Sequence, residues 1–437
     1  MSKETSHASK FRGRSIRDLG RAERKGAVLA LVAVSTVGLL SLLALAIDGG
    51  ALQREKRLIQ TAADAGALAG AVEIFRNRTD SVSFAANSET SRNGFANGAN
   101  GNTITVTWPS TSARYSGSKF VTVEVSRVVP TNLANIFGQN AVTVRATATA
   151  GIVLAEYCFI VLDPTGNHTL EVNNQAKLIG SGCGIDVNST SATGAYASGQ
   201  AQISAPSIGV SGSAVDGNAG AFSPAAKYNV PPTPDPLAYL VKPPVPATCD
   251  FGSAAAPLKI TGTITLNPGT YCGGMDLKPG ANVTLTQGLY ILRGGGLNIV
   301  GGGSTLRSTG TGVTFFNTAP PPGASYTWGP IFIQSSTVTL DIAANTDPSS
   351  ALPGVLFYSD PAAPNLINVF KAGSVSRMDG TMYFPTQTVQ FGSGATFTIN
   401  GALVANRVQL SNNLQVTFTG YNGGADFFAL KRPTIVE

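Results

Sequence analysis

The sequence predicts a mainly β protein that begins with a transmembrane helix and ends in a parallel β-helix. Three observations support this fold class. An uncharged apolar run covers residues 26–47 and passes directly into an alanine-rich helical segment. The remainder is low in charge and rich in Gly, Thr, Ser, Asn, Val and Pro, which disfavours helices and suits short strands. Glycine-led strand motifs recur there at intervals near 20 residues. A β-sandwich with irregular loops is the structural alternative.

The first element is a basic tail, residues 1–25, followed by the apolar run. The tail holds eight Lys or Arg residues and three acidic ones, whereas only Arg54, Lys56 and Arg57 follow the run closely. As a helix, residues 26–47 rise about 33 Å, enough to cross a hydrocarbon core about 30 Å thick. The positive-inside rule then predicts a cytoplasmic tail and an extracytoplasmic remainder.

A cleaved signal peptide is the competing interpretation of the same residues. Ala44-Leu45-Ala46 fits a small-x-small cleavage site. However, the apolar run exceeds the roughly 7–15 residues of a signal peptide, and the helical pattern continues through the cleavage point. The sequence therefore favours a membrane anchor.

The net charge of +6 comes almost entirely from the tail, because the other 412 residues carry 22 basic and 21 acidic side chains. Nucleic-acid-binding proteins show basic clusters with interleaved aromatic residues, and the part of the chain beyond the span shows no such pattern. The tail is better explained as a topology signal that favours anionic lipid head groups. The sequence predicts a membrane partner and no nucleic-acid partner.

Residues 48–77 are predicted to extend the membrane helix as an amphipathic helix outside the membrane. Gly66, Ala67 and Gly70 give this helix a small-residue surface that another helix or a sheet can approach closely. Two interpretations remain open: packing on the chain's own domain, or packing against helices of other subunits.

A sequence motif runs through this junction. The basic tail ends in Lys-Gly-Ala, an acidic residue and a glycine follow the span, and a Gln-x-Ala-Ala-Asp-Ala run comes next. The residues that carry it are Asp48, Gly49, Gln60, Ala62, Ala63, Asp64, Ala65, Ala67, Leu68, Ala69 and Gly70, with Ile59 in place of the usual Leu. On these residues the chain resembles TadG-like proteins of the bacterial tight-adherence (Flp-type) pilus systems.

Weaker similarities to the same family occur further along the chain, in the order in which the family has them, at residues 129–131, 136–138, 158–163, 234–237 and 380–391. The resemblance implies a role in pilus assembly or anchoring, with other pilus-system subunits as partners and no catalytic activity. It does not extend to a processed prepilin, because the fifth residue after Gly26 is Leu31 rather than Glu.

Residues 78–156 are predicted to form a small α/β module. Thr103–Thr107 and Phe120–Ser126 alternate like half-buried strands, and Val121, Val123 and Val125 share one face. Asn132–Phe137 is a short helical stretch ended by Gly138, and Ala141–Ala148 is a further alternating strand.

Residues 157–437 are predicted to form the β-solenoid. Its repeat is a glycine followed by a strand, at Gly269, Gly288, Gly312, Gly329, Gly354, Gly380 and Gly401. Each coil would contribute two or three short strands. The proline-rich residues 223–248 interrupt the repeat and predict an extended connector or surface excursion.

All four cysteines follow the span: Cys158, Cys183, Cys249 and Cys272. An even number in an oxidising compartment favours disulfides. A zinc site would need partners that are missing, because there is no CxxC and His168 is the only histidine beyond the span. Neighbouring coils stack about 4.8 Å apart, which suits a disulfide between them. The spacings therefore predict bonds from Cys158 to Cys183 and from Cys249 to Cys272.

Enzymatic chemistry is the serious alternative, because many β-helices act on polysaccharides. Glycosidase or lyase chemistry needs clustered carboxylates, whereas Asp276, Asp341, Asp347, Asp360 and Asp379 are scattered along the chain. The sequence predicts no catalytic residues, no cofactor, no metal and no small-molecule substrate.

The predicted function is that of a non-catalytic envelope protein, anchored in the bacterial inner membrane, that supports a tight-adherence pilus. Its C-terminal domain would be periplasmic or exposed on the cell surface. The alternative is a surface adhesin or polysaccharide-binding β-helix, in which Tyr326, Trp328, Tyr358, Tyr383 and Phe384 form a sugar-binding patch.

Overall fold

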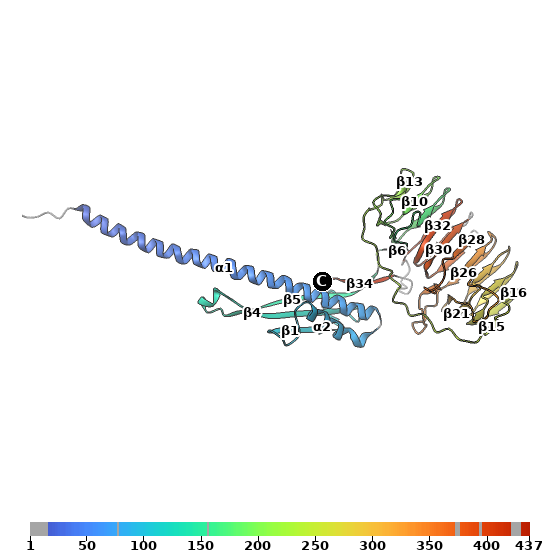
Figure 1. Cartoon of the computed structure of the whole chain (residues 1–437), viewed down its shortest axis with the longest axis horizontal. Helices are drawn as coiled ribbons and strands as arrows, with labels where there is room; N and C mark the ends of the chain where they lie inside the picture. The colour runs from blue at the N-terminus through green and yellow to red at the C-terminus, as the bar shows by residue number, and fades with distance from the viewer. Residues whose placement is uncertain (1–15, 77, 155–156, 372–375, 393–395, 421–429) are drawn as a thin grey trace, which may run out of the picture. The chain divides into compact units, whose positions relative to one another are not determined.

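The computed structural model describes residues 16–76, 78–154, 157–371, 376–392, 396–420 and 430–437, and it confirms a mainly β fold (Figure 1). The chain forms two compact units. Unit 1 comprises Met1–Ile152 and Pro433–Glu437, and unit 2 comprises Val153–Arg432. Unit 2 is therefore an insertion into unit 1. The predicted division differs, since it placed the last five residues in the solenoid.

The long helix α1, Ile16–Phe75, contains both the predicted span and its extension without interruption. Its described apolar side chains between residues 28 and 47 are exposed, and burial begins at Asp48. Among the described residues, α1 is the one helix long and apolar enough to cross a membrane. An exposed apolar surface of this length suits contact with lipid.

The rest of unit 1 is a four-stranded sheet with two helices on one face. The sheet order is β1 (Asn102–Thr107), β4 (Phe120–Pro130), β5 (Ala141–Leu154) and β34 (Lys431–Ile435). Strands β1, β4 and β5 pair antiparallel, and β2 (Ser110–Thr111) pairs with β3 (Ser116–Gly117) in a small side hairpin. The alternation predicted in β4 is confirmed, because Val121, Val123 and Val125 are fully buried.

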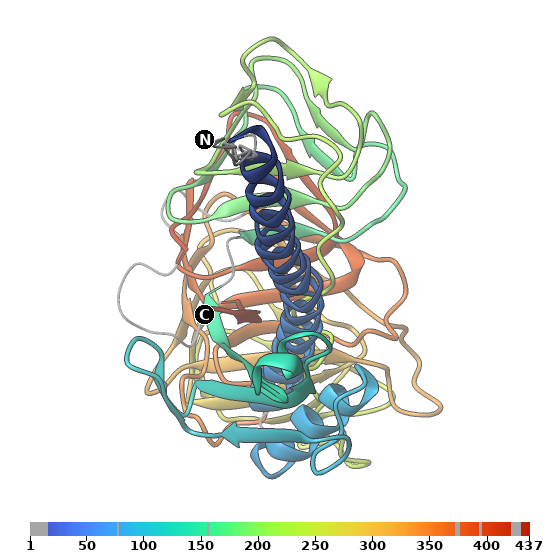
Figure 2. The ribbon, with the colours of Figure 1, turned by 90° about the vertical axis from the view of Figure 1, so that its left-hand side faces the viewer.

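The core of unit 1 lies between this sheet and the C-terminal half of α1. After the short helix η1 (Thr79–Ser81), helix α2 (Val82–Arg92) turns back beside α1 (Figures 1 and 2). The α1 side chains in the core are mostly small, which allows this close approach; they are Ile59, Ala62, Ala63, Ala67 and Ala71.

Unit 2 is a parallel β-helix, as the sequence predicts, and each coil contributes three strands, where the sequence predicts two or three. The first strands of successive coils are β6 (Tyr157–Val161), β9 (Gly184–Val187), β12 (Ile208–Val210), β15 (Phe251–Gly252), β18 (Gly269–Cys272), β21 (Gly288–Arg293), β24 (Val313–Thr318), β27 (Val355–Ser359), β30 (Thr381–Gly392) and β32 (Leu403–Ser411). The second strands are β7 (Leu170–Val172), β10 (Ala195–Ala197), β13 (Asp216–Gly217), β16 (Leu258–Ile260), β19 (Met275–Leu277), β22 (Leu297–Ile299), β25 (Ile331–Gln334), β28 (Ile367–Lys371) and the later parts of β30 and β32. The third strands are β8 (Lys177–Gly180), β11 (Gln202–Ser204), β14 (Phe222–Ser223), β17 (Thr263–Leu266), β20 (Asn282–Leu285), β23 (Thr305–Ser308), β26 (Thr339–Ala343), β29 (Ser376–Asp379), β31 (Thr396–Ile399) and β33 (Gln415–Phe418).

The coils do not stack in sequence order. The third strands form a sheet of order β14-β11-β8-β33-β31-β29-β26-β23-β20-β17. The first coil, with β6, therefore lies between the second coil and the last one, since β6 pairs with both β9 and β32. Three coils wind toward one end of the stack, and seven more begin at the other end and wind back. The first and last coils are neighbours inside the stack.

The proline-rich residues 224–250, here called the strap, carry the chain from one end of the solenoid to the other. Figure 1 shows the strap in yellow-green along one side of unit 2, between β13 and β15. Its partners occur in the same order as the coils that it passes. They are Asn188 for Thr233, Tyr383 for Asp235, Asp360 for Lys242 and Arg293 for Pro246. The predicted connector is thus a bonded part of the solenoid surface.

The glycine repeat was assigned correctly at six of its seven positions. Gly269, Gly288, Gly312, Gly354, Gly380 and Gly401 all lead a first strand of a coil. Gly329 is the exception, because it precedes β25, which pairs with the second strands β22 and β28. The loop between β24 and β25 lengthens this coil. A simple period of about 20 residues therefore assigns Gly329 to a first strand, although it precedes a second strand.

Candidate functional site

The membrane-proximal end of unit 1 is built around Asp48, the first charged residue after the apolar run. Its carboxylate accepts backbone N–H bonds from Asn132 and Leu133 at 3.0 Å each and from Ala134 at 2.6 Å. These bonds, that from Ala134 above all, hold the pKa of Asp48 below its usual range. We call Asp48 and these three N–H groups the clasp. It joins the helix to a loop more than 80 residues away.

The loop of the clasp is preformed by its own sequence. Pro130 ends β4, and the Thr131 backbone N–H donates to the Asn140 carbonyl at 3.1 Å, which closes the β4–β5 connection. The short helix η2 (Ala134–Phe137) follows, where the sequence predicts a helical stretch. Gly138 then turns the chain with a φ of 84°, a conformation that glycine adopts readily.

Further contacts tie α1 to both strands of this hairpin. Arg127 Nη1 lies 2.6 Å from Glu55 Oε1, and its guanidinium carbon lies 5.2 Å from the centre of the Phe95 ring. Lys56 Nζ donates to the Arg145 carbonyl. The helix is thus fixed to its own module at the point where it leaves the apolar run.

The small residues of α1 face the same module, which bears on the two interpretations left open by the sequence. A Cβ added at Gly66 would lie 2.6 Å from Thr90 Cγ2 of α2, and one at Gly70 would lie 3.1 Å from Val121 Cγ1 of β4. Ala67 is fully buried between these elements. Gly66, Ala67 and Gly70 are therefore buried inside unit 1, in keeping with the first of the two open interpretations, packing on the chain's own domain.

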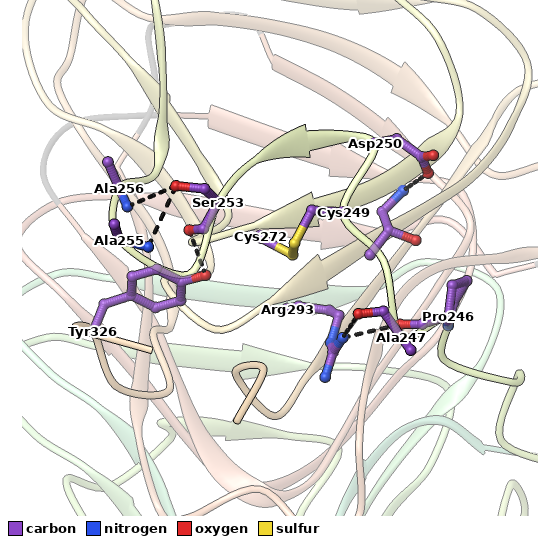
Figure 3. The surroundings of a disulfide bond; sticks show 11 residues. Pro246, Ala247, Cys249, Asp250, Ser253, Ala255, Ala256, Cys272, Arg293 and Tyr326 are labelled. Atoms are coloured by element: carbon purple, nitrogen blue, oxygen red, sulfur yellow. Dashed lines mark hydrogen bonds between the residues drawn. A yellow bond between two sulfur atoms is a disulfide. The ribbon is translucent and has the colours of Figure 1, made fainter. Parts of the chain in front are cut away.

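The four cysteines are brought together in two pairs within unit 2. Cys158 is bonded to Cys183, and Cys249 to Cys272. The second bond attaches the end of the strap to β18 (Figure 3). Beside it, Asp250 Oδ2 accepts the Thr270 N–H at 2.7 Å, and buried Arg293 donates to the Pro246 carbonyl at 2.9 Å. Both disulfides join neighbouring coils.

Three of the five aromatic residues considered for sugar binding are buried, whereas Tyr326 and Trp328 are half-buried, so the predicted patch of five does not form. Tyr358, Tyr383 and Phe384 are at most 2% exposed, because they belong to the ladder of rings inside the solenoid. The Tyr383 hydroxyl donates to Asp235 Oδ2 of the strap at 2.7 Å. Burial raises the pKa of this Asp235 carboxyl.

A charged cluster that the sequence treats as scattered lies on the third-strand sheet. Strand register places Asp341 of β26 beside Arg377 of β29. Arg377 Nε donates to Asp379 Oδ2 at 2.6 Å, and Arg377 Nη1 lies 3.7 Å from Asp341 Oδ1. With Thr311 and neighbouring residues they line a hollow of about 370 Å³. The contact was missed because the length of this coil is not visible in the sequence.

Metal binding has no geometric support in the described part of the chain. There, no three His, Cys, Asp or Glu side chains gather closely enough to hold an ion.

Comparison with known proteins finds one family model that matches a segment of the chain. Residues 26–73 match the family model described as "Putative Flp pilus-assembly TadE/G-like". This match confirms the predicted resemblance to TadG-like proteins of Flp pilus systems and supports involvement in Flp pilus assembly. No curated protein and no solved structure matches the chain. The matched segment holds Asp48, whereas the loop that it binds lies beyond the match.

Proposed function

We propose that this chain, which is TadE/G-like over residues 26–73, is a non-catalytic envelope protein that supports assembly or anchoring of an Flp pilus. The family match over the apolar run and the following helix is the observation that carries the proposal. In it, α1 crosses the bacterial inner membrane with the basic tail in the cytoplasm. Both units then lie in the periplasm or on the cell surface, where disulfides persist.

The structure of unit 1 explains how such an anchor could work. The clasp, the Glu55–Arg127 ion pair and the packing of α2 hold α1 to a folded sheet immediately after the span. A displacement of the membrane helix is then passed to unit 1 and is not absorbed by a loose linker. Contacts with other pilus subunits inside the membrane use the exposed face of residues 28–47.

The experiment is a clean deletion of the gene followed by electron microscopy of the cells. We expect surface pili to disappear and to return when the intact gene is supplied in trans. Normal pilus numbers in the deletion strain would refute the proposed function. Cleavage of a polysaccharide by the purified protein would refute its non-catalytic part.

A polysaccharide-binding adhesin is the second candidate, and the hollow beside Arg377 is the observation that favours it. Carboxylates and a guanidinium offer the hydrogen bonds that sugar hydroxyls accept and donate. Binding of the purified protein to bacterial and host glycans tests this function. The variant Arg377→Ala should abolish such binding, and Lys177→Ala, at an exposed site on β8, four strands from β26 in the same sheet, should not.

A further inference from the structure

The tip of the β4–β5 hairpin lies beside the apolar run of α1. We define the hairpin tip as residues 128–144, which include no charged side chain. Figure 1 shows this tip, in teal, reaching back along α1 toward the N-terminal end of the helix. Ser41 and Leu45 of the run line a hollow together with Thr131, Ala134 and Val142 of the hairpin tip.

Helix geometry gives the depth of this contact. Ser41 precedes Asp48 by seven residues, or about 10 Å along the helix axis. If residues 26–47 lie in the hydrocarbon core, the hairpin tip extends to the level of the outer head groups or deeper. The contact with Leu45 is therefore at a depth where water is scarce.

The exposed side chains of the hairpin tip suit that environment. Ile136 is 76% exposed and Val128 is 51% exposed. On α1, Leu45 is 72% exposed and Ile47 is 47% exposed, so apolar side chains are exposed on both elements. The other exposed side chains near the turn are uncharged amides, at Asn132, Asn135, Gln139 and Asn140, so no charge opposes contact with the membrane interface.

Apart from Asp48, the first charged side chains on the helix, at residues 54–56, lie at the same level as those on the hairpin. Arg127 and Arg145 flank the uncharged hairpin tip, and they meet Glu55 and Lys56 of α1. Glu55 follows the end of the run by eight residues, or about 12 Å of helix, which is just beyond the head-group region. Asp48 is the exception, because it lies closer to the membrane than the other charged residues. Its carboxylate accepts hydrogen bonds from three backbone N–H groups.

We propose that the hairpin tip inserts into the outer-leaflet interface of the membrane that α1 crosses, with Ile136 at the acyl boundary. The partner is the lipid bilayer itself. This inference rests on the membrane anchor of the proposed function. A second membrane contact fixes the rotation of unit 1 about α1, which a single helix cannot do.

The test uses the full-length protein in lipid vesicles, with one introduced cysteine at a time for a spin label. All described cysteines are in disulfides, so the label has a single target under non-reducing conditions. Ile136→Cys and Asn135→Cys probe the hairpin tip, and Val37→Cys probes the span. Phe84→Cys is the matched control, because Phe84 is 77% exposed on α2, which packs near Gly66 and Gly70 of α1.

The measurement is the ratio of collisions with oxygen, which enters lipid, to collisions with a water-soluble nickel chelate. We expect a high ratio at residues 37 and 136 and a low ratio at residue 84, with residue 135 in between. A ratio at 136 as low as at 84, with 37 still high, would overturn the inference and leave the anchor intact. Low ratios at both 37 and 136 would refute the anchor as well. Shielding of 136 from both reagents would indicate a protein cover and would also overturn the inference.

Discussion

Asp48 shows how much a single residue contributes beyond its place in a pattern. The sequence marks it as the acidic residue that follows the span, and it gives no sign that the carboxylate binds the backbone of residues 132–134. That contact depends on the length of the β4–β5 hairpin and on where Pro130 ends the strand. Sequence periodicity gives neither the length of the hairpin nor the end of the strand, so the contact between Asp48 and residues 132–134 could not be predicted.

Asp48→Ala should release the loop of the clasp. Three backbone N–H groups lose a charged acceptor, and bonds to charged groups are among the strongest in proteins. We expect the amides of Asn132, Leu133 and Ala134 to exchange with solvent about tenfold faster or more in hydrogen-exchange mass spectrometry. Asp80→Ala, at an exposed acidic residue of the same unit, is the control. Unchanged exchange in Asp48→Ala would contradict the clasp.

The same contact predicts a pH dependence. The pKa of Asp48 is lowered in the folded protein, so its contribution to stability is complete above the ordinary Asp pKa of about 3.9. The contribution is lost only as the pH falls through the lowered folded value. Amide protection at residues 132–134, corrected for intrinsic exchange, should therefore persist at pH 5. Loss of this protection between pH 6 and pH 5 would show that another group controls the loop.

Gly66→Leu should destabilise unit 1 itself. Its Cβ would lie 2.6 Å from Thr90 Cγ2 and 3.2 Å from the Ala86 carbonyl oxygen, and overpacking of this kind costs about 1–3 kcal/mol. The readout is the protection of α2 amides against hydrogen exchange. Gly50→Leu is the matched control, because a Cβ at Gly50 meets nothing within 4 Å. Equal protection in the two variants would argue that α1 and α2 do not pack as described.

At the scale of elements, the strap is where sequence and structure differ most in detail. Its prolines predict an extended connector, and that is what forms. Its course over the solenoid was not predictable, because its partners Asn188, Tyr383, Asp360 and Arg293 are distributed over four coils. Each of them is an ordinary polar residue until the coils are stacked.

Arg293→Ala should loosen the end of the strap. The Arg293 side chain is buried and donates to the carbonyls of Pro246 and Ala247, so its loss leaves both without that donor. We expect faster proteolytic cleavage within residues 224–248, measured by mass spectrometry of the fragments. Arg307→Ala, at an exposed arginine of β23, should leave the cleavage rate unchanged. A similar cleavage rate in both variants would contradict the claim that Arg293 holds the end of the strap on the solenoid.

The disulfides provide a chemical test of coil stacking. Non-reducing peptide mapping should yield one peptide pair that contains Cys158 and Cys183 and another that contains Cys249 and Cys272. This result is expected because each pair lies on neighbouring coils. A bond between Cys158 and Cys272 would be incompatible with the order of the coils, and free thiols would contradict the disulfides themselves.

At the scale of the whole molecule, the sequence predicts a solenoid but not the order of its coils. Any glycine-led strand can pair with the next, so periodicity alone favours stacking in sequence order. The strap makes the observed order possible. Its 27 residues would extend about 84 Å in a polyproline conformation, against about 43 Å for the nine steps between ten coils.

The coil order also explains why unit 2 can be an insertion. Its first and last coils are neighbours, so the chain enters and leaves the solenoid at adjacent coils. The chain then returns to unit 1, where the Thr149 N–H donates to the Glu437 carbonyl at 2.7 Å beside β5. The predicted domain boundaries lacked this return because the last residues form only one short strand.

The central claim is that an anchored body serves Flp pilus assembly, and complementation of the deletion strain tests it most directly. One strain receives the intact gene, and the other receives a gene in which a cleavable secretion signal replaces residues 1–47, which releases the same folded units. Pili are then counted by electron microscopy, and disulfide mapping verifies that the released protein is folded. The account predicts pili with the intact chain and none with the released one. Equal pilus numbers in the two strains would contradict it.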